Sequence, residues 1–267
     1  MEEVELPEKV DVIVSEWMGY FLLRESMVQS VLYARDRWLK QTGVMYPSHA
    51  SILLATLREP GFSELRAREF KSEMEGWGNI AAELKTLYSL DYEALRKTIE
   101  KENIDFMYRQ TWQSRLGGNA VVGTPQTLLS VDMKNTTVEE LFGWHRTVQL
   151  DPPPTGVTGL DPQPVDLLCG WFYVRFSAEG CDRESFLSTS PFDTPTHWKQ
   201  TTFTLDPPLA PPYNIYVALE QSRKSHHDLN VTMAYQGSEG VEMSVNYAIT
   251  STVRNEARSD FDATAKA

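Results

Sequence analysis

The stretch VDVIVSEWMGYFLLRESM, residues 10–27, decides the expected fold because it joins a strand, a bend and the start of a helix. It opens with a run of β-branched residues, which is typical of a strand covered on both faces. That run stops before Glu16. From Glu25 to Lys40 apolar residues recur at helical spacing, and Gly43 fits a helix C-terminal cap. Since the chain then reads as extended again, the pattern predicts an α/β unit of strand, loop, helix and strand.

A second kind of sequence begins near residue 60, where Glu, Lys, Arg, Ala and Leu dominate. We expect an inserted helical arm at about 60–115, with helical stretches near 63–75, 80–101 and 103–115. The Gly-Trp-Gly-Asn run at 76–79 is expected to interrupt it, because glycine disfavours a helix interior.

After the arm, short apolar runs alternate with Gly, Pro and Asp, which indicates an antiparallel sandwich or barrel. The expected domains are therefore an α/β part at 1–46, a β-domain at 47–250 that carries the arm, and a tail at 251–267.

Composition narrows the class of protein. The chain has 267 residues and a formal net charge of -12, from 37 acidic and 25 basic side chains. This balance argues against direct nucleic-acid binding and favours cationic partners, although surplus acid also serves solubility alone. The apolar runs are too short to cross a membrane, the first residues do not resemble a secretory signal, and only two cysteines occur. We expect a location in the cytoplasm and nucleus.

The two glutamates of the opening stretch suggest a binding site. Glu16 follows the carboxyl end of a strand, where ligands bind in open α/β sheets, and Glu25 begins the next helix. Gly19 allows a tight path between them. Two carboxylates near one another favour a cation between them, and the planar guanidinium of arginine suits paired carboxylates best. Because 37 residues are acidic, such a pair is also common by chance, and a purely structural or solvent-facing role stays open.

The same residues resemble a known family. SEWMGYFLLRESM at 15–27 resembles the double-glutamate loop of the protein arginine methyltransferases, and THWKQ at 196–200 resembles their Thr-His-Trp loop. LYARDRWLKQTGVMYPSHA at 32–50 is similar to the stretch that follows the first loop there. The resemblance extends to about residue 250 and is greatest to the plant subgroup with a long arm. It implies methyl transfer from S-adenosylmethionine to a substrate arginine nitrogen. The fold it implies is an α/β remnant of a Rossmann-like methyltransferase domain, plus a mainly antiparallel β-barrel with an inserted helical dimerisation arm.

The resemblance also assigns roles near the first loop. Glu16 and Glu25 match the catalytic acids that bind the guanidinium, and Tyr20 falls on the substrate-binding side. Met27 matches a methionine that crowds the reacting nitrogen in enzymes that make asymmetric dimethylarginine, and it also faces the cofactor. Glu2 aligns with an acid near the adenine of the cofactor.

In the second loop, His197 matches a catalytic histidine and Trp198 a substrate-binding residue that closes the site. The residues alone favour a core histidine before a strand for His197, over a histidine bonded to an acid across the domain interface, and a core tryptophan for Trp198. The histidines show no ligand spacing with the cysteines, so we expect no metal site. The sequence also contains no Gly-x-Ser-x-Gly or P-loop pattern, which argues against the common hydrolases and NTPases.

Other expectations follow from the resemblance. The family carries a glycine-rich cofactor turn, a ribose-binding acid and covering helices upstream of the double-glutamate loop, and this sequence does not show them. We therefore expect the chain to be truncated at its N-terminus and inactive alone. The implied partners are Arg-rich proteins such as histones or RNA-binding proteins, with a homodimer formed through the arm. The alternatives are a non-catalytic partner that binds Arg-rich peptides or regulates a complete methyltransferase, and an unrelated β-domain.

Overall fold

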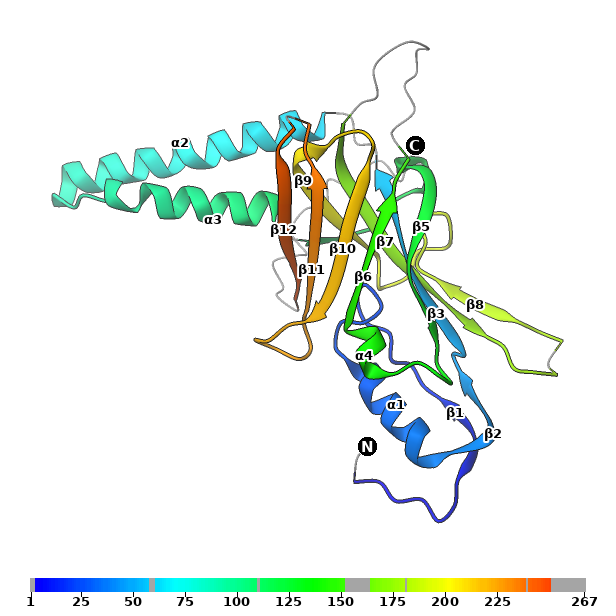
Figure 1. Cartoon of the computed structure of the whole chain (residues 1–267). Coiled ribbons are helices and arrows are strands. Elements are labelled where there is room, and N and C mark those ends of the chain that lie inside the picture. The colour runs from blue at the N-terminus through cyan, green and yellow to red at the C-terminus, as the bar shows by residue number, and fades with distance from the viewer. Residues whose placement is uncertain are drawn as a thin grey trace, which may run out of the picture.

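The computed structural model shows three parts: a small α/β unit, a β-domain and a projecting helical arm (Figure 1). It describes residues 3–57, 61–109, 111–151, 164–180, 182–238 and 240–250. The tail expected at 251–267 lies outside the described residues. Within those residues, no helix is both long and apolar enough to span a membrane.

The α/β unit has the predicted order. Strand β1, Val10–Val14, pairs in parallel with β2, Leu39–Tyr46, and helix α1, Met27–Trp38, connects them. The expectation that the first strand is covered on both faces is wrong, because Val12 is 46% and Val14 74% exposed. The described residues place only two strands in this sheet, so much of β1 has no neighbour to cover it.

The end of α1 also differs from the expectation. The helix ends at Trp38, and Leu39 is already extended while its amide donates to the Arg35 carbonyl. Gly43 therefore lies inside β2 and is no helix cap. Glycine fits this position, since a Cβ at Gly43 would lie 2.9 Å from the Lys40 carbonyl oxygen and the backbone would have to shift.

The arm is a hairpin of two helices that points away from the sheets (Figure 1). Helix α2 covers Phe62–Tyr88, and a short 3-10 turn at Glu93–Leu95 leads into α3, Arg96–Tyr108. The predicted break at 76–79 is wrong, as are the stretches at 80–101 and 103–115. The chain turns instead at Ser89, whose φ of 57° is left-handed.

A helix can continue through two glycines when packing offsets their cost of about 1 kcal/mol each. The Arg96 guanidinium of α3 lies over the Trp77 ring, with the carbon 5.2 Å from the ring centroid. A Cβ at Gly78 would lie 3.9 Å from an Arg96 nitrogen. That distance is an ordinary contact, so it is the Arg96–Trp77 pair that joins the two helices at the point where a break was expected.

The β-domain consists of two antiparallel sheets. The larger has the order β4-β9-β7-β3-β5 with β8 paired to β7, and the smaller has the order β12-β11-β10-β6. The strands of the larger sheet are β3 His49–Leu57, β4 Thr111–Ser114, β5 Val121–Asp132, β7 Val165–Phe176, β8 Ser185–Ser188 and β9 Gln200–Leu209. Those of the smaller are β6 Gly143–Gln149, β10 Asn214–Gln221, β11 Leu229–Gln236 and β12 Glu242–Ile249, with the short helix α4, Val138–Leu141, before β6.

The expected barrel is not closed in the part of the chain that the structure describes. The two sheets approach one another at two places, β4 against β12 and β6 against β5. At each place a side chain donates a hydrogen bond from one sheet to the other. The Thr111 hydroxyl of β4 donates to the Ala248 carbonyl of β12 over 3.2 Å, and Arg146 Nη1 of β6 donates to the Thr127 carbonyl of β5 over 2.8 Å. Among the described residues no backbone ladder joins β4 to β12 or β5 to β6, and β4 has only four residues. The antiparallel content is as predicted.

One apolar core joins both sheets to the segment that follows β1. The Phe21 ring lies 5.5 Å from Phe203 of β9, and Phe203 lies 5.3 Å from Tyr247 of β12, both in edge-to-face geometry. A Cβ at Gly170 of β7 would lie 2.3 Å from the Phe21 ring. A glycine is therefore needed in β7, because the loop side chain occupies that space.

Candidate functional site

Residues 15–26, here called the two-glutamate loop, connect β1 to α1. The loop begins where the Ser15 amide donates to the Tyr46 carbonyl of β2 over 3.0 Å. Its apolar side chains are buried, with 5% exposure or less: Trp17, Met18, Phe21, Leu22 and Leu23. Glu16 and Glu25, at its two ends, are exposed. The sequence therefore places carboxylates where a well-packed loop returns to the surface.

The first half of this loop is anchored by the turn before β9 that contains His197 and Trp198, here called the His-Trp turn. The Trp198 indole nitrogen donates to the Met18 carbonyl over 2.8 Å, and the indole ring lies edge-on to Phe172, 5.7 Å between centroids. The exposed His197 ring lies tilted against Trp198, with ring centroids 3.8 Å apart. The structure thus brings the two sequence motifs into contact. The alternative that made His197 a core histidine is wrong, whereas Trp198 belongs to the core.

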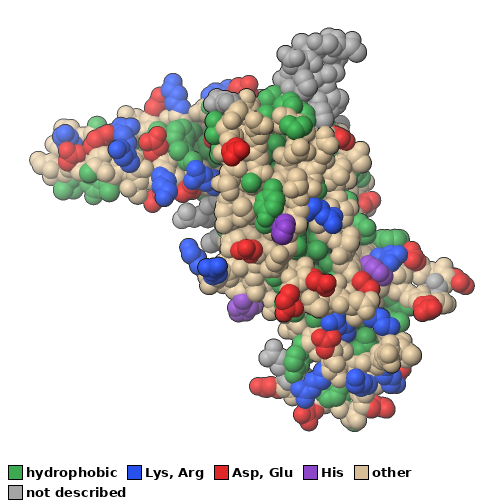
Figure 2. Space-filling model, in the orientation of Figure 1, with side chains coloured by type: hydrophobic (Ala, Val, Ile, Leu, Met, Phe, Trp, Pro, Cys, Tyr) green, Lys and Arg blue, Asp and Glu red, His purple; other side chains and the backbone are tan. Residues whose placement is uncertain are grey.

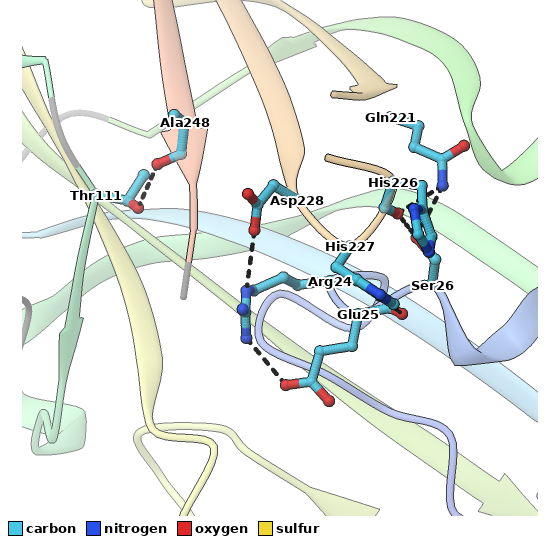
Figure 3. Close-up of polar contacts among 9 residues, drawn as sticks. All are labelled: Arg24, Glu25, Ser26, Thr111, Gln221, His226, His227, Asp228 and Ala248. Carbon is cyan, nitrogen blue, oxygen red and sulfur yellow. Dashed lines mark hydrogen bonds and ion pairs between the residues drawn. The ribbon is translucent and has the colours of Figure 1, made fainter. Parts of the chain in front are cut away.

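The second half is anchored by residues 222–228, here called the β10–β11 loop (Figure 3). The Glu25 amide donates to the His227 carbonyl over 2.7 Å, and His227 Nδ1 donates to the Glu25 carbonyl over 2.8 Å. The Ser26 hydroxyl donates to the His226 carbonyl. Gln221 Nε2, just before this loop, donates to Ser26 Oγ over 3.0 Å and to the His226 carbonyl over 2.6 Å. Backbone and side chain together therefore fix the position of Glu25.

These contacts hold an unusual backbone. Glu25 has φ 81° and Ser26 has φ 57°, in the left-handed region that costs a residue other than glycine roughly 1–2 kcal/mol. Such conformations persist where surrounding contacts over-determine them, and they cluster at functional sites. The direction of the Glu25 side chain is accordingly set by the β10–β11 loop.

Arg24 occupies the interior beside Glu25. Its Nη1 lies 2.9 Å from Glu25 Oε1, and its Nε lies 3.7 Å from Asp228 Oδ1 of the β10–β11 loop. The guanidinium carbon is 5.8 Å from the centroid of the half-buried Tyr20 ring. The Arg24 side chain is 7% exposed and that of Glu25 46%. A buried cation is thus paired with the more accessible carboxylate.

A cavity of about 500 Å³ adjoins Glu25. It lies against α1, the β10–β11 loop and α4, and its lining residues are Glu25, Ser26, Met27, Gln29, Ser30, Leu32, Tyr33, Asp36, Val138, His226 and His227. Of the residues predicted from the sequence, the cavity brings together Glu25 and Met27, which is 47% exposed. Glu16, Tyr20, His197 and Trp198 are not among its lining residues. Glu2 lies outside the described residues.

The described residues offer little for metal or thiol chemistry. Among them, no group of three or more His, Cys, Asp or Glu side chains is placed to hold a metal ion. Burial raises the pKa of the Cys169 thiol of β7, which disfavours the reactive thiolate. The chemical character of the site is therefore that of carboxylates at a partly covered surface, which suits a cationic ligand.

Comparison with known proteins identifies the family. The family model described as the arginine methyltransferase oligomerization subdomain matches residues 63–240. The chain belongs to the protein arginine methyltransferase family. Protein arginine N-methyltransferase PRMT10 of Arabidopsis thaliana is 34% identical over 241 residues, which is 87% of this chain and 61% of that protein. PRMT10 of Oryza sativa subsp. japonica is 36% identical over 244 residues, 88% of this chain and 62% of that protein.

Solved structures of the family agree with the fold. A crystal structure of Arabidopsis thaliana protein arginine methyltransferase 10, in a uniquely open conformation, matches with a TM-score of 0.78 at 32% identity, over 93% of this chain and 73% of that one. The Trypanosoma brucei PRMT1 enzyme-prozyme heterotetrameric complex with AdoHcy matches with a TM-score of 0.66 at 21% identity, over 93% of this chain and 71% of that one, which shows a shared fold alone. This arginine methyltransferase chain thus spans about three fifths of the length of its curated relatives.

Sequence reasoning missed the residues that position Glu25 in this methyltransferase family member. They are Arg24, Gln221, His226, His227 and Asp228. Arg24 directly precedes Glu25, whereas the segment that holds the other four lies about 200 positions away, so no local spacing indicates those four. The one available signal is the polar run QSRKSHHD between two apolar strands, which by itself is typical of a hairpin loop.

Proposed function

We propose that the chain is the substrate-binding part of a protein arginine N-methyltransferase. Such an enzyme transfers methyl from S-adenosylmethionine to a guanidino nitrogen of arginine in a protein substrate. The observation that carries the proposal is Glu25: its backbone is held by the β10–β11 loop, and its carboxylate is 46% exposed beside a cavity. A carboxylate fixed in this way binds a guanidinium by charge-assisted hydrogen bonds and orients one terminal nitrogen for attack.

Other residues take supporting roles in this proposal. Glu16 supplies the second carboxylate, and His197 lies on the turn that Trp198 anchors to the two-glutamate loop. Met27, half exposed at the first position of α1, limits the room around the reacting nitrogen. Such crowding favours asymmetric dimethylarginine as the product.

The methyl donor belongs to the proposal as well. It would supply an activated methyl group on a sulfonium, and Met27 is the described side chain that would face it. Its adenosine part also needs backbone N–H groups and an acid for the ribose. The described two-stranded β1–β2 unit offers exposed valines and no such set of donors, so the residues described do not form a complete donor site. The proposal is therefore that the chain alone does not catalyse methyl transfer.

Partners follow from charge and from the arm. A net charge of -12 favours Arg-rich protein substrates such as histones or RNA-binding proteins, in the cytoplasm and nucleus. Along the arm, hydrophobic side chains lie between charged ones (Figure 2). Five large apolar residues toward its end are 45% to 66% exposed: Ile80, Leu87, Tyr88, Leu90 and Leu95. We assign these residues to the interface of a homodimer formed through the arm, where a partner would cover them.

Titration calorimetry with an Arg-Gly-rich peptide tests the proposal. The control ligand is the same peptide with lysine at every arginine. We expect the chain to prefer the arginine peptide and Glu25→Gln to weaken binding about tenfold, the loss of one charge-assisted contact. Glu8→Gln, an exposed carboxylate before β1, is the matched control and should bind as the parent does. Equal binding of both peptides would contradict the proposal.

The non-catalytic alternative is separated by a transfer assay with labelled S-adenosylmethionine. If the chain alone transferred label to the peptide, the 267 residues would suffice for the donor. Peptide binding without label, and without stimulation of a complete methyltransferase, fits a fragment that only holds the substrate. Stimulation on mixing would favour a regulatory partner that acts through the arm.

A further inference from the structure

Arg24 stands out among the charged residues near the site because it is buried. Only 6% of the residue is exposed, and Glu25, the next residue, is far more accessible. A buried arginine is stable only when carboxylates or other acceptors surround its guanidinium. The carboxylates that contact the Arg24 guanidinium therefore indicate its role.

Those partners come from two elements. Glu25 Oε1 of the two-glutamate loop lies 2.9 Å from Nη1, and Asp228 Oδ1 of the β10–β11 loop lies 3.7 Å from Nε (Figure 3). The Asp228 side chain is only 19% exposed. One cation between two carboxylates leaves this cluster with one unbalanced negative charge. That charge is available to a single incoming cation.

The geometry of Glu25 shows where the charge is accessible. Arg24 binds Oε1, and the second carboxylate oxygen points away from Arg24 (Figure 3). Displacing Arg24 from Glu25 would leave a buried guanidinium with one carboxylate, Asp228 at 3.7 Å, which is unfavourable. An arriving guanidinium therefore adds to the second oxygen while Arg24 stays in place.

We propose that Arg24 is a positioning residue, which holds Glu25 through Oε1 so that the other carboxylate oxygen receives the substrate arginine. This inference rests on the proposed function. It assigns Glu25 a single acceptor oxygen toward the substrate, in place of a two-oxygen fork. Asp228 supports the arrangement by keeping the Arg24 guanidinium between the two loops.

The test is a double-mutant cycle on the 267-residue chain, read by calorimetry with the Arg-Gly-rich peptide. Arg24→Met keeps most of the side-chain stem and removes the charge, and it should weaken binding about tenfold. Glu25→Gln should cost a similar factor. Because Arg24 acts through Glu25, the double variant should bind within about twofold of Glu25→Gln alone. A general packing defect at Arg24 would instead add its full loss to that of Glu25→Gln.

Two further variants keep the result interpretable. Arg37→Met, on α1 and paired with Glu5 at 3.3 Å, is the matched control and should bind as the parent does. Arg24→Lys retains the charge without the planar fork, so it should recover part of the affinity. If Arg24→Met does not fold by circular dichroism, the cycle is run with Arg24→Lys, and the same non-additivity with Glu25→Gln is expected.

Each remaining outcome overturns the inference in a recognisable way. Parent-like or tighter binding by the Arg24 variant would show that Arg24 does not position Glu25 or that it competes with the substrate. Additive losses would show a structural role only. If the parent chain itself does not prefer the arginine peptide over the lysine peptide, the proposed function fails and this inference falls with it.

Discussion

The two ends of the two-glutamate loop are held in different ways. Near Glu16 the chain is fixed by buried apolar side chains and by the bond from the Trp198 indole, which belongs to the turn before β9. Near Glu25 it is fixed by polar contacts to the β10–β11 loop of the other sheet. The separation of the two carboxylates therefore depends on how the two sheets pack, although both lie within one short segment.

The largest expected effect is at the apolar end. Trp198→Ala removes a core indole, its bond to Met18 and its contact with Phe172, so we expect a loss of about 3–5 kcal/mol in the free energy of unfolding. Urea denaturation followed by circular dichroism measures it. Trp198→Phe keeps a ring and loses the hydrogen bond, which should cost much less. If the two variants are equally unstable, the hydrogen bond from the indole to Met18, and not the packing of the ring, holds the Glu16 end of the loop.

The next effect compares the two glutamates directly. Glu25→Gln removes the charge that pairs with the buried Arg24, and we expect it to lower stability by about 2 kcal/mol. Glu16→Gln changes an exposed side chain, for which about 0.5 kcal/mol or less is expected. Parallel urea titrations provide the test. Similar values for the two variants would remove the distinction between the two ends.

A smaller effect tests the polar end alone. Ser26→Ala deletes a buried hydroxyl that contacts the His226 carbonyl and Gln221, so we expect a loss of about 1 kcal/mol. Ser30→Ala, one turn further along α1, is the matched control and should change stability by about 0.5 kcal/mol or less. Thermal melts of both variants suffice, and an unchanged Ser26→Ala melt would argue against the polar anchor.

The smallest effect concerns salt. Raising the salt concentration should screen the partly exposed Arg24–Glu25 pair more than the apolar packing. Hydrogen exchange followed by NMR should show the Glu25 amide, bonded to His227, exchanging about twofold faster. The Leu23 amide, bonded to Phe21 within the apolar half, should keep its rate. Equal acceleration of both amides would indicate that the loop opens as one unit.

Much of the fold could be predicted because its signals are local. The β-branched run before Glu16 and the helical spacing after Glu25 predicted β1 and α1, and the short strands after the arm predicted antiparallel sheets. The wrong predictions at Gly43 and at 76–79 share one cause. Local propensity indicated a break at each glycine, whereas contacts with a second element, β1 along β2 in one case and Arg96 on Trp77 in the other, accompany a continuous strand and a continuous helix.

By itself, the sequence determined which elements form and which carboxylates flank a buried bend, since periodicity and residue type act over a few positions. Only the tertiary structure decided how Glu25 is held. Arg24 precedes it in the chain, but Gln221, His227 and Asp228 reach it from about 200 residues away. Contacts over such a separation form when the two sheets pack around a common core, and no spacing within the chain encodes them.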